Sequence, residues 1–179
     1  MITLILVALA LLLVVFLAVA ALRPADFRIV RSIAINAPAG AVFPYLNDLH
    51  LWQEFSPWAK LDPQVQNTYT GPAAGVGASL SWSGNAKIGQ GSMTIIESVP
   101  GELVRMNLVF IRPFPANNLA EFTLQSAGDQ TSITWSMTGR YNFIARAVGL
   151  IMNMEKLVGG DFARGLATLK TLAEATKRP

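Results

Sequence analysis

The sequence has no cysteine and a single histidine, His50, among its 179 residues. A chain without cysteine forms no disulfide, has no thiol nucleophile and offers no thiolate ligand to a metal. A single imidazole also excludes a site in which several histidines hold a metal. We therefore expect no metal site and no cofactor, and the lack of disulfides suits a reducing compartment.

Charge is scarce as well. Only 14% of the residues are charged, and the net charge is +3. A nucleic-acid-binding surface needs a concentrated basic patch, whereas the basic residues here are dispersed. We expect no nucleic-acid partner, and at most a weak attraction to anionic lipid.

The segment Ile2–Leu22 has no charged residue, no proline and no glycine. As a helix, its 21 residues would span roughly 30 Å, the thickness of the hydrocarbon core of a bilayer. The segment therefore predicts a single transmembrane helix. We expect an anchor over residues 1–23 and one globular domain over residues 24–179.

A cleaved signal peptide is the alternative for this segment, since Ala18-Val19-Ala20 resembles a cleavage site. However, no basic residue precedes the apolar run, and the run is longer than the roughly 7–15 apolar residues of a signal peptide. Arg23, Arg28 and Arg31 follow the segment, and basic residues favour the cytoplasmic side. We expect a protein of the cell membrane whose domain lies in the cytoplasm.

The domain has the pattern of an α+β fold. Phe27–Ile35 alternates as a strand, Asn36-Ala37-Pro38 begins a short helix, and Asp48 caps a second helix that ends before Pro57. Short turns separate the later apolar runs, which predicts antiparallel pairing. The six runs are Val65–Thr70, Ala78–Ser83, Lys87–Ser98, Leu103–Ile111, Leu119–Ser126 and Thr131–Tyr141.

The last part of the chain has apolar residues three and four positions apart, which predicts a long amphipathic helix. Glycine weakens a helix, so we expect either a break near Gly149–Asn153 or a kink at Gly159-Gly160. A sheet with one apolar face must cover that face, and only this helix is long enough. The order predicts a seven-stranded curved antiparallel sheet wrapped round the C-terminal helix, with a cavity between them.

Several segments resemble the START/Bet v 1-like (SRPBCC) superfamily, specifically the bacterial proteins called polyketide cyclase/dehydrase. The resemblance extends from about Phe27 to Glu174, and it rests on Ser56-Pro57-Trp58, Asp62-Pro63, Ser81-Trp82-Ser83-Gly84-Asn85, Thr131–Gly139 and Gly160-Asp161-Phe162. It implies a helix-grip fold with an internal apolar cavity. Members of the superfamily bind lipids, sterols, hormones and polyketides, and a few are enzymes, so the resemblance transfers no particular reaction.

Aromatic and methionine side chains are the candidate ligand site, because broad rings and flexible thioethers line apolar pockets. The same residues also suit an ordinary hydrophobic core. The candidates are Trp52, Phe55, Trp58, Trp82, Met93, Phe110, Trp135, Met137, Met154 and Phe162.

Catalytic candidates are few. His50, Glu54 and Tyr69 could act as acid or base, although a histidine on a short surface helix is more often simply solvated. No Gly-x-Ser-x-Gly motif is present to supply a serine nucleophile. An inward pair of Glu121 and Arg140 could recognise a carboxylate, but charges more often lie on an outer sheet face.

Three functions follow from these patterns. The first is a membrane-anchored protein that binds an apolar small molecule or lipid in an internal cavity. The second is a cyclase- or dehydratase-like enzyme acting on an apolar substrate. The third is a regulatory interaction module without a ligand, which a filled core would favour.

Overall fold

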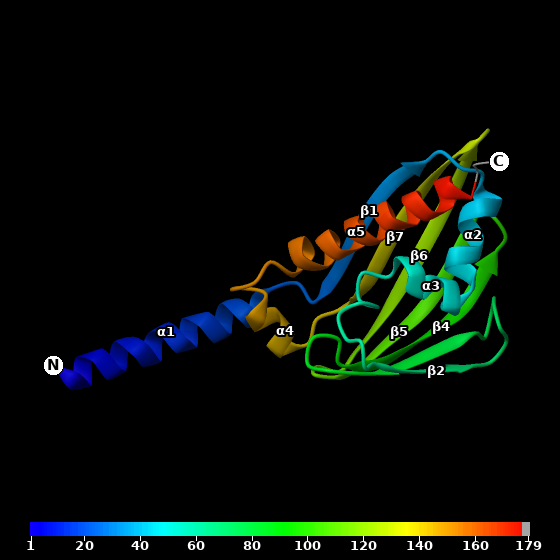
Figure 1. Ribbon diagram of the computed structural model, residues 1–179. Helices are drawn as coiled ribbons and strands as arrows, with labels where there is room; N and C mark the ends of the chain where they lie inside the picture. The colour runs from blue at the N-terminus through cyan, green and yellow to red at the C-terminus, as the bar shows by residue number, and fades with distance from the viewer. Residues whose placement is uncertain (177–179) are drawn as a thin grey trace.

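Seven antiparallel strands form one curved sheet around the C-terminal helix (Figure 1). The computed structural model describes residues 1–176. Neighbours in the sheet are also neighbours in sequence from β2 to β7, because their connections are short, and β1 lies beside β7. The predicted fold class is confirmed. In spatial order the strands are β1 (Asp26–Ile35), β7 (Gln130–Arg140), β6 (Ala116–Ala127), β5 (Leu103–Arg112), β4 (Gln90–Val99), β3 (Ser79–Ser83) and β2 (Gln66–Thr70).

Two short helices, α2 (Ala39–Asn47) and α3 (Leu49–Phe55), follow β1. The carboxylate of Asp48 caps α3 by accepting a 2.7 Å hydrogen bond from the backbone N–H of His50, as predicted. The helix ends at Phe55, two residues before Pro57. Val42, Leu46 and Trp52 are buried, so both helices contribute to the core on the inner face of the sheet.

The C-terminal region contains a break near Gly149–Asn153, the first of the two predicted alternatives. α4 (Phe143–Val148) and α5 (Met154–Ala175) are separate helices, whereas Gly159 and Gly160 lie inside α5. α5 runs along β1 and β7, and Gly165 faces the indole of Trp135. A Cβ atom at Gly165 would lie 3.0 Å from Cζ3 of Trp135, so this glycine allows helix and sheet to approach closely.

Two strands begin three residues away from the predicted start, whereas the other strand ends lie within one residue of the prediction. β6 begins at Ala116, three residues before Leu119, because Ala116 pairs with Phe110 of β5 and the pairing outweighs the turn preference of the asparagines. β4 begins at Gln90 and not at Lys87, since the side chain of Asn85 accepts a hydrogen bond from the backbone of Lys87 and holds a turn there.

The N-terminal helix α1 (Ile2–Leu22) projects away from the sheet (Figure 1). It is the one helix among residues 1–176 that is long and apolar enough to cross a membrane, and its most apolar stretch is not buried against the protein. Ala20, near its end, is fully buried where α1 meets the domain. Signal sequences share this length and composition, so the helix alone does not distinguish a transmembrane anchor from a cleaved signal peptide.

Glu174 links the end of α5 to Asn36, the residue that follows β1. Its carboxylate accepts hydrogen bonds of 2.7 Å from the backbone N–H of Asn36 and from Nζ of Lys170. The bonds to Lys170 and to Asn36 lower the pKa of Glu174 below its ordinary value of 4.5. The charged form is therefore favoured by folding.

The stabilisation from Glu174 should be lost in acid. A lowered folded pKa gives stability that is fully present above the unfolded value and disappears as the pH falls through the folded value. We expect Glu174→Gln to unfold more easily than wild type at about pH 7, and the gap to narrow at about pH 3. Thermal unfolding of the detergent-solubilised chain measures it. Glu54→Gln, at an exposed position, is the control. A stability difference between wild type and Glu174→Gln that does not change with pH would contradict a role of the Glu174 charge, and so would the same pH dependence in Glu54→Gln.

Candidate functional site

The inner face of the sheet carries five of the ten predicted ligand residues: Trp82, Met93, Phe110, Trp135 and Met137. Strand pairing places Trp82 opposite Gly91, Met93 opposite Leu108, and Phe122 opposite Trp135. Because side chains alternate along a strand, these residues point to the side occupied by α5. This face has two parts: one is covered by α5 and the short helices, and the other is more open.

The covered part is a packed cluster of aromatic rings, with Trp135 at its centre. Its indole stacks on Phe162 of α5 at a centroid distance of 4.0 Å, and the rings of Phe122 and Trp52 lie 4.8 and 5.4 Å away. Trp52, Phe55, Trp135 and Phe162 are each at most 4% exposed. These predicted ligand residues thus come together, but they pack against one another beneath α5.

Trp58 lies at the edge of this aromatic cluster. It is half-buried, and its ring meets Trp135 and Phe162 edge to face at 5.9 and 6.2 Å. Met154 is also half-buried and occupies the first turn of α5. Both residues therefore stand between the covered core and solvent.

The more open part lies on β3 to β6, beyond the helix. Trp82 and Phe110 are partly exposed and meet edge to face at 5.8 Å. Gly91 lies between them, and a side chain there would collide with the indole of Trp82. The indole N–H donates a 3.2 Å hydrogen bond to the backbone oxygen of Ile88, which fixes the ring. Two broad rings are thus held at the surface of the inner face.

A polar group without a partner lies on the same inner face, on the side of β6 toward Gly139 of β7. Asn118 of β6 is 8% exposed and pairs with Leu108 on one side and Gly139 on the other. Its Oδ1 is buried and accepts no hydrogen bond from the described residues. Leaving such an atom unpaired costs roughly 1–3 kcal/mol. We call Trp82, Leu108, Phe110 and Asn118 the open inner face.

Two of its neighbours are methionines, as predicted. Met93 and Met137 are 7% and 8% exposed, and Met137 pairs with Ala120 across β6. Met93 pairs with Leu108 of the open inner face, and flexible thioethers adapt to ligands of different shape. Trp82 and Phe110 are therefore the predicted ligand residues that belong to the open inner face, and Met93 and Met137 border it.

The catalytic candidates lie apart from these rings, near the edge strand β2. The imidazole of His50 stacks on Tyr69 at 3.9 Å, and its Nδ1 lies 3.3 Å from Oδ1 of Asp48. Burial, and then the charge of Asp48, raise the pKa of Tyr69 above its ordinary value of 10.0. Its phenol therefore stays protonated near neutral pH. His50 and Glu54 are exposed.

Glu97, Arg105, Glu121 and Arg140 lie on the outer face. Arg105 is bound by Glu97 and Glu121 from the strands on either side, which raises the pKa of its guanidinium, chiefly through the bond with Glu121. Arg140 pairs with Asp26 at 3.1 Å. The alternative of an inward pair of Glu121 and Arg140 is therefore wrong. Glu121 pairs with Arg105 of β5, and Arg140 pairs with Asp26 of β1.

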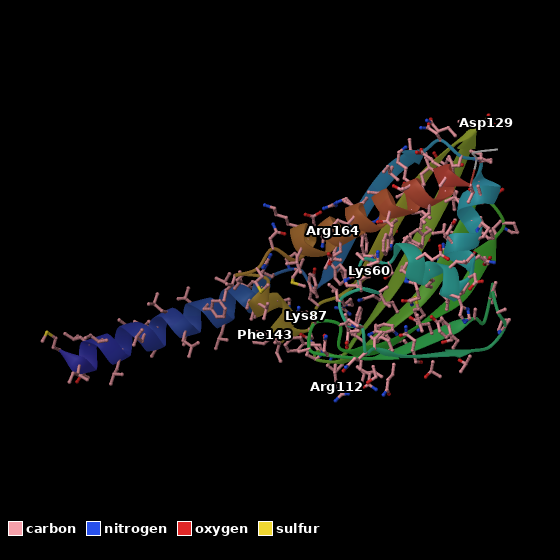
Figure 2. All side chains as sticks on the ribbon, viewed as in Figure 1. Lys60, Lys87, Arg112, Asp129, Phe143 and Arg164 are labelled. Atoms are coloured by element: carbon pink, nitrogen blue, oxygen red, sulfur yellow. The ribbon has the colours of Figure 1, made fainter. Side chains whose placement is uncertain are left out.

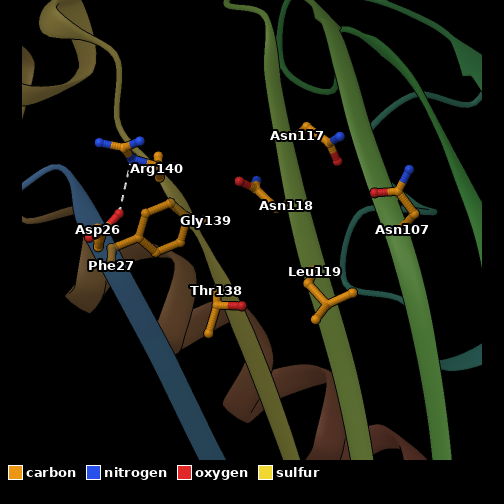
Figure 3. Close-up of a pocket in the computed structure, with 9 residues that line it drawn as sticks. All are labelled: Asp26, Phe27, Asn107, Asn117, Asn118, Leu119, Thr138, Gly139 and Arg140. Atoms are coloured by element: carbon orange, nitrogen blue, oxygen red, sulfur yellow. Dashed lines mark ion pairs between the residues drawn. The ribbon is translucent and has the colours of Figure 1, made fainter.

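An open hollow of about 490 Å³ lies at one end of the sheet (Figure 3). By strand alternation, Asn107, Asn117, Leu119 and Thr138 line it from the outer face, and Phe27, Asn118 and Gly139 line it from the inner face. The pair of Asp26 and Arg140 forms its rim. A second hollow of about 750 Å³ lies near Pro100. Neither is lined by a predicted ligand residue. The enclosed cavity expected between helix and sheet remains a prediction.

Sequence reasoning did not select Asn118. The signal that could have found it is the pair Asn117-Asn118 at the start of a strand, since asparagine is depleted in strands. That pair was instead interpreted as part of a turn. The register with β5 places Asn118 on the inner face, opposite Leu108.

A curved sheet gripping a long helix, with an apolar inner face, defines a helix-grip protein of the Bet v 1-like class. The model of the family described as "Polyketide cyclase / dehydrase and lipid transport" matches residues 26–174. The chain belongs to this family, which confirms the resemblance. Among proteins with curated descriptions, none matches the sequence.

Solved structures support the fold. Protein CV1439 from Chromobacterium violaceum is 18% identical with a TM-score of 0.58, over 85% of this chain and 99% of the other. The Aha1 dimer from Colwellia psychrerythraea is 16% identical with a TM-score of 0.59, over 85% and 99%. Norcoclaurine synthase from Thalictrum flavum, solved with dopamine and hydroxybenzaldehyde, is 13% identical with a TM-score of 0.64, over 87% and 91%.

Proposed function

We propose that the chain is a membrane-anchored protein that binds an apolar small molecule or lipid on the open inner face. The single observation that carries this proposal is the partly exposed pair of rings, Trp82 and Phe110, on the inner face of the sheet. The family description, which includes lipid transport, supports it. The norcoclaurine synthase structure, which holds two small aromatic molecules, supports it as well.

The binding energy would come mainly from burial. Covering about 200 Å² of apolar surface contributes on the order of 5 kcal/mol, before the cost of association is subtracted. The amide of Asn118 both donates and accepts hydrogen bonds. A ligand with one hydroxyl or carbonyl group on an otherwise apolar body would satisfy it and be oriented by it.

The anchor in this proposal is α1, and the domain lies on the cytoplasmic side. Arg23 ends α1 and Arg28 is exposed on β1, so both are placed to follow the positive-inside tendency. Arg31 contributes less than its position in the sequence suggests, because it points inward and pairs with Glu155 at 2.8 Å. Residues 1–23 form the anchor and residues 24–179 the domain.

Replacing Trp82 with alanine should weaken ligand binding by about tenfold or more, because a ring of this size contributes at least 1.4 kcal/mol when a ligand covers it. Fluorescence polarisation of a labelled fatty acid, with the full chain in nanodiscs, measures the affinity. The control is Val76→Ala, an exposed residue of the loop between β2 and β3. Equal affinity of wild type and Trp82→Ala would place the ligand elsewhere.

A cyclase- or dehydratase-like enzyme is the second candidate. The family description supports it, and His50 with its neighbours Asp48 and Tyr69 is the grouping that favours it. Such an enzyme would use His50 as its acid or base, so His50→Ala would abolish turnover of an apolar substrate. Unchanged turnover would remove this role of His50.

A regulatory interaction module without ligand is the third candidate. The close packing of Trp52, Phe55, Trp135 and Phe162 beneath α5 favours it. The similar Aha1 structure, which is a dimer, also supports it. For such a module, the labelled fatty acid would bind neither wild type nor Trp82→Ala above the level of empty nanodiscs.

A further inference from the structure

The two ends of the sheet differ in the side chains they expose. β1 begins beside the end of α1, and the antiparallel order places the start of β6 and the end of β5 at that same end. The loops 84–89 and 113–115 and the segment 141–153 therefore lie there too. We call these three segments, with Lys60, the near end.

Apolar side chains are exposed at the near end. Ile151 is 80% exposed, Ile144 53%, Phe114 51% and Met152 47%. At the opposite end, the large apolar residues exposed in the described loops and strand ends are Val76 and Val99. Exposed apolar groups that gather in this way mark a surface that contacts a partner or a membrane.

Basic residues are exposed toward the near end, and the exposed Asp26 of that end is paired with Arg140. Lys60, Lys87 and Arg112 are exposed on the side of the domain toward α1, whereas Asp129 lies at the far end (Figure 2). Glu102 is also at the far end, in the turn between β4 and β5. Cations beside exposed apolar side chains complement the anionic surface of a membrane.

The near end is also fixed against α1. Arg146 of α4 donates hydrogen bonds from Nη1 to the backbone oxygens of Ala21 and Arg23, at 2.9 and 3.3 Å. These oxygens belong to the C-terminal end of α1, which has no further helical partners and attracts a positive charge. The same guanidinium lies 5.8 Å from the ring of Phe143. α4 therefore sits where α1 would leave the bilayer.

We propose that the near end docks onto the surface of an anionic bilayer, with Phe114, Ile144, Ile151 and Met152 inserted among the headgroups and Lys60, Lys87 and Arg112 against the lipid phosphates. This inference rests on the proposed membrane anchor. It gives the domain a fixed orientation. The open inner face, at whose near end Trp82 and Phe110 lie, then stands next to the membrane, from which an apolar ligand enters.

The absence of cysteine makes the test direct. An environment-sensitive fluorophore is attached to the full chain in the single variants Ile151→Cys, Phe114→Cys and Val76→Cys. Each variant is placed in vesicles with or without phosphatidylglycerol. Lipids with a nitroxide in the headgroup act as quenchers. We expect quenching at positions 151 and 114 but not at 76, and stronger quenching with the anionic lipid. Lys60→Gln and Lys87→Gln should each lower the ratio of docked to free domain about fivefold.

A fluorophore at Leu12→Cys distinguishes failure of the docking proposal from failure of the proposed anchor. If it is quenched by acyl-chain nitroxides while positions 151 and 114 behave like 76, the anchor stands and the docking proposal is overturned. If it is not quenched, α1 is not inserted, and the anchor and the docking fall together. Binding of the labelled fatty acid at Trp82 is measured independently of both.

Discussion

Replacing Trp135 with alanine is expected to lower the free energy of unfolding by about 3–5 kcal/mol. Trp135 is 2% exposed and touches the rings of Phe162, Phe122 and Trp52, so its removal leaves a cavity beneath α5. Aromatic contacts add about 0.5–1.5 kcal/mol per pair to the loss of buried area. Since domains of this size are stable by about 5–15 kcal/mol, the variant should be close to unfolding. Urea titration followed by fluorescence measures it.

Trp135→Phe is the matched control. Its ring keeps the stack on Phe162, and the indole N–H that is lost has no hydrogen-bond partner among the described residues. Replacing a polar group that makes no bond costs little, so this variant should lose less than about 1.5 kcal/mol. If it were as unstable as Trp135→Ala, the N–H would have a role that the structure does not show.

Two lysines in α1, Leu12→Lys with Val15→Lys, should remove the chain from the membrane. Each charge costs about 2.5–3.5 kcal/mol at the helix centre, whereas each Leu, Ile, Val or Phe contributes only about 0.3–0.6 kcal/mol to insertion. Alkaline carbonate extraction should find wild type in the membrane pellet and the variant in the supernatant. Leu12→Ala with Val15→Ala is the control and should stay in the pellet.

The intact mass of wild type extracted from membranes completes this test. A retained anchor predicts a mass that includes α1. A mass that lacks the residues up to about Ala20 would show cleavage after the small-residue motif and contradict the anchor.

Much of the fold could be predicted because its elements are local. Turn residues separate the strands, and the alternation in β1 places Arg31 on the same face as Ile29 and Ile33. What the sequence could not supply is the partner of Arg31 on that face. Glu155 lies 124 positions away in sequence, since 155 minus 31 is 124, and only the packing of α5 on β1 brings the two together. Long-range ion pairs of this kind have no local signal.

The candidate site also depends on long-range packing that has no local signal in the sequence. Alternation assigns both Trp82 and Trp135 to the inner face, and nothing local distinguishes them. They differ because α5 lies over β1 and β7 and leaves β3 to β5 less covered (Figure 1). Trp135 is therefore a core residue, while Trp82 stays partly exposed. The position of a helix across a sheet depends on side-chain packing over the whole interface.

The open inner face is tested most directly by photolabelling. The full chain in nanodiscs is irradiated with a diazirine-bearing fatty acid and then digested, and the labelled peptides are mapped by mass spectrometry. We predict that label appears on β3 and β5, at Trp82 and Phe110, and on β6 next to Asn118. An excess of unlabelled fatty acid should remove it. Label confined to α1, or to the outer-face residues Asn107 and Thr138, would contradict binding at the open inner face.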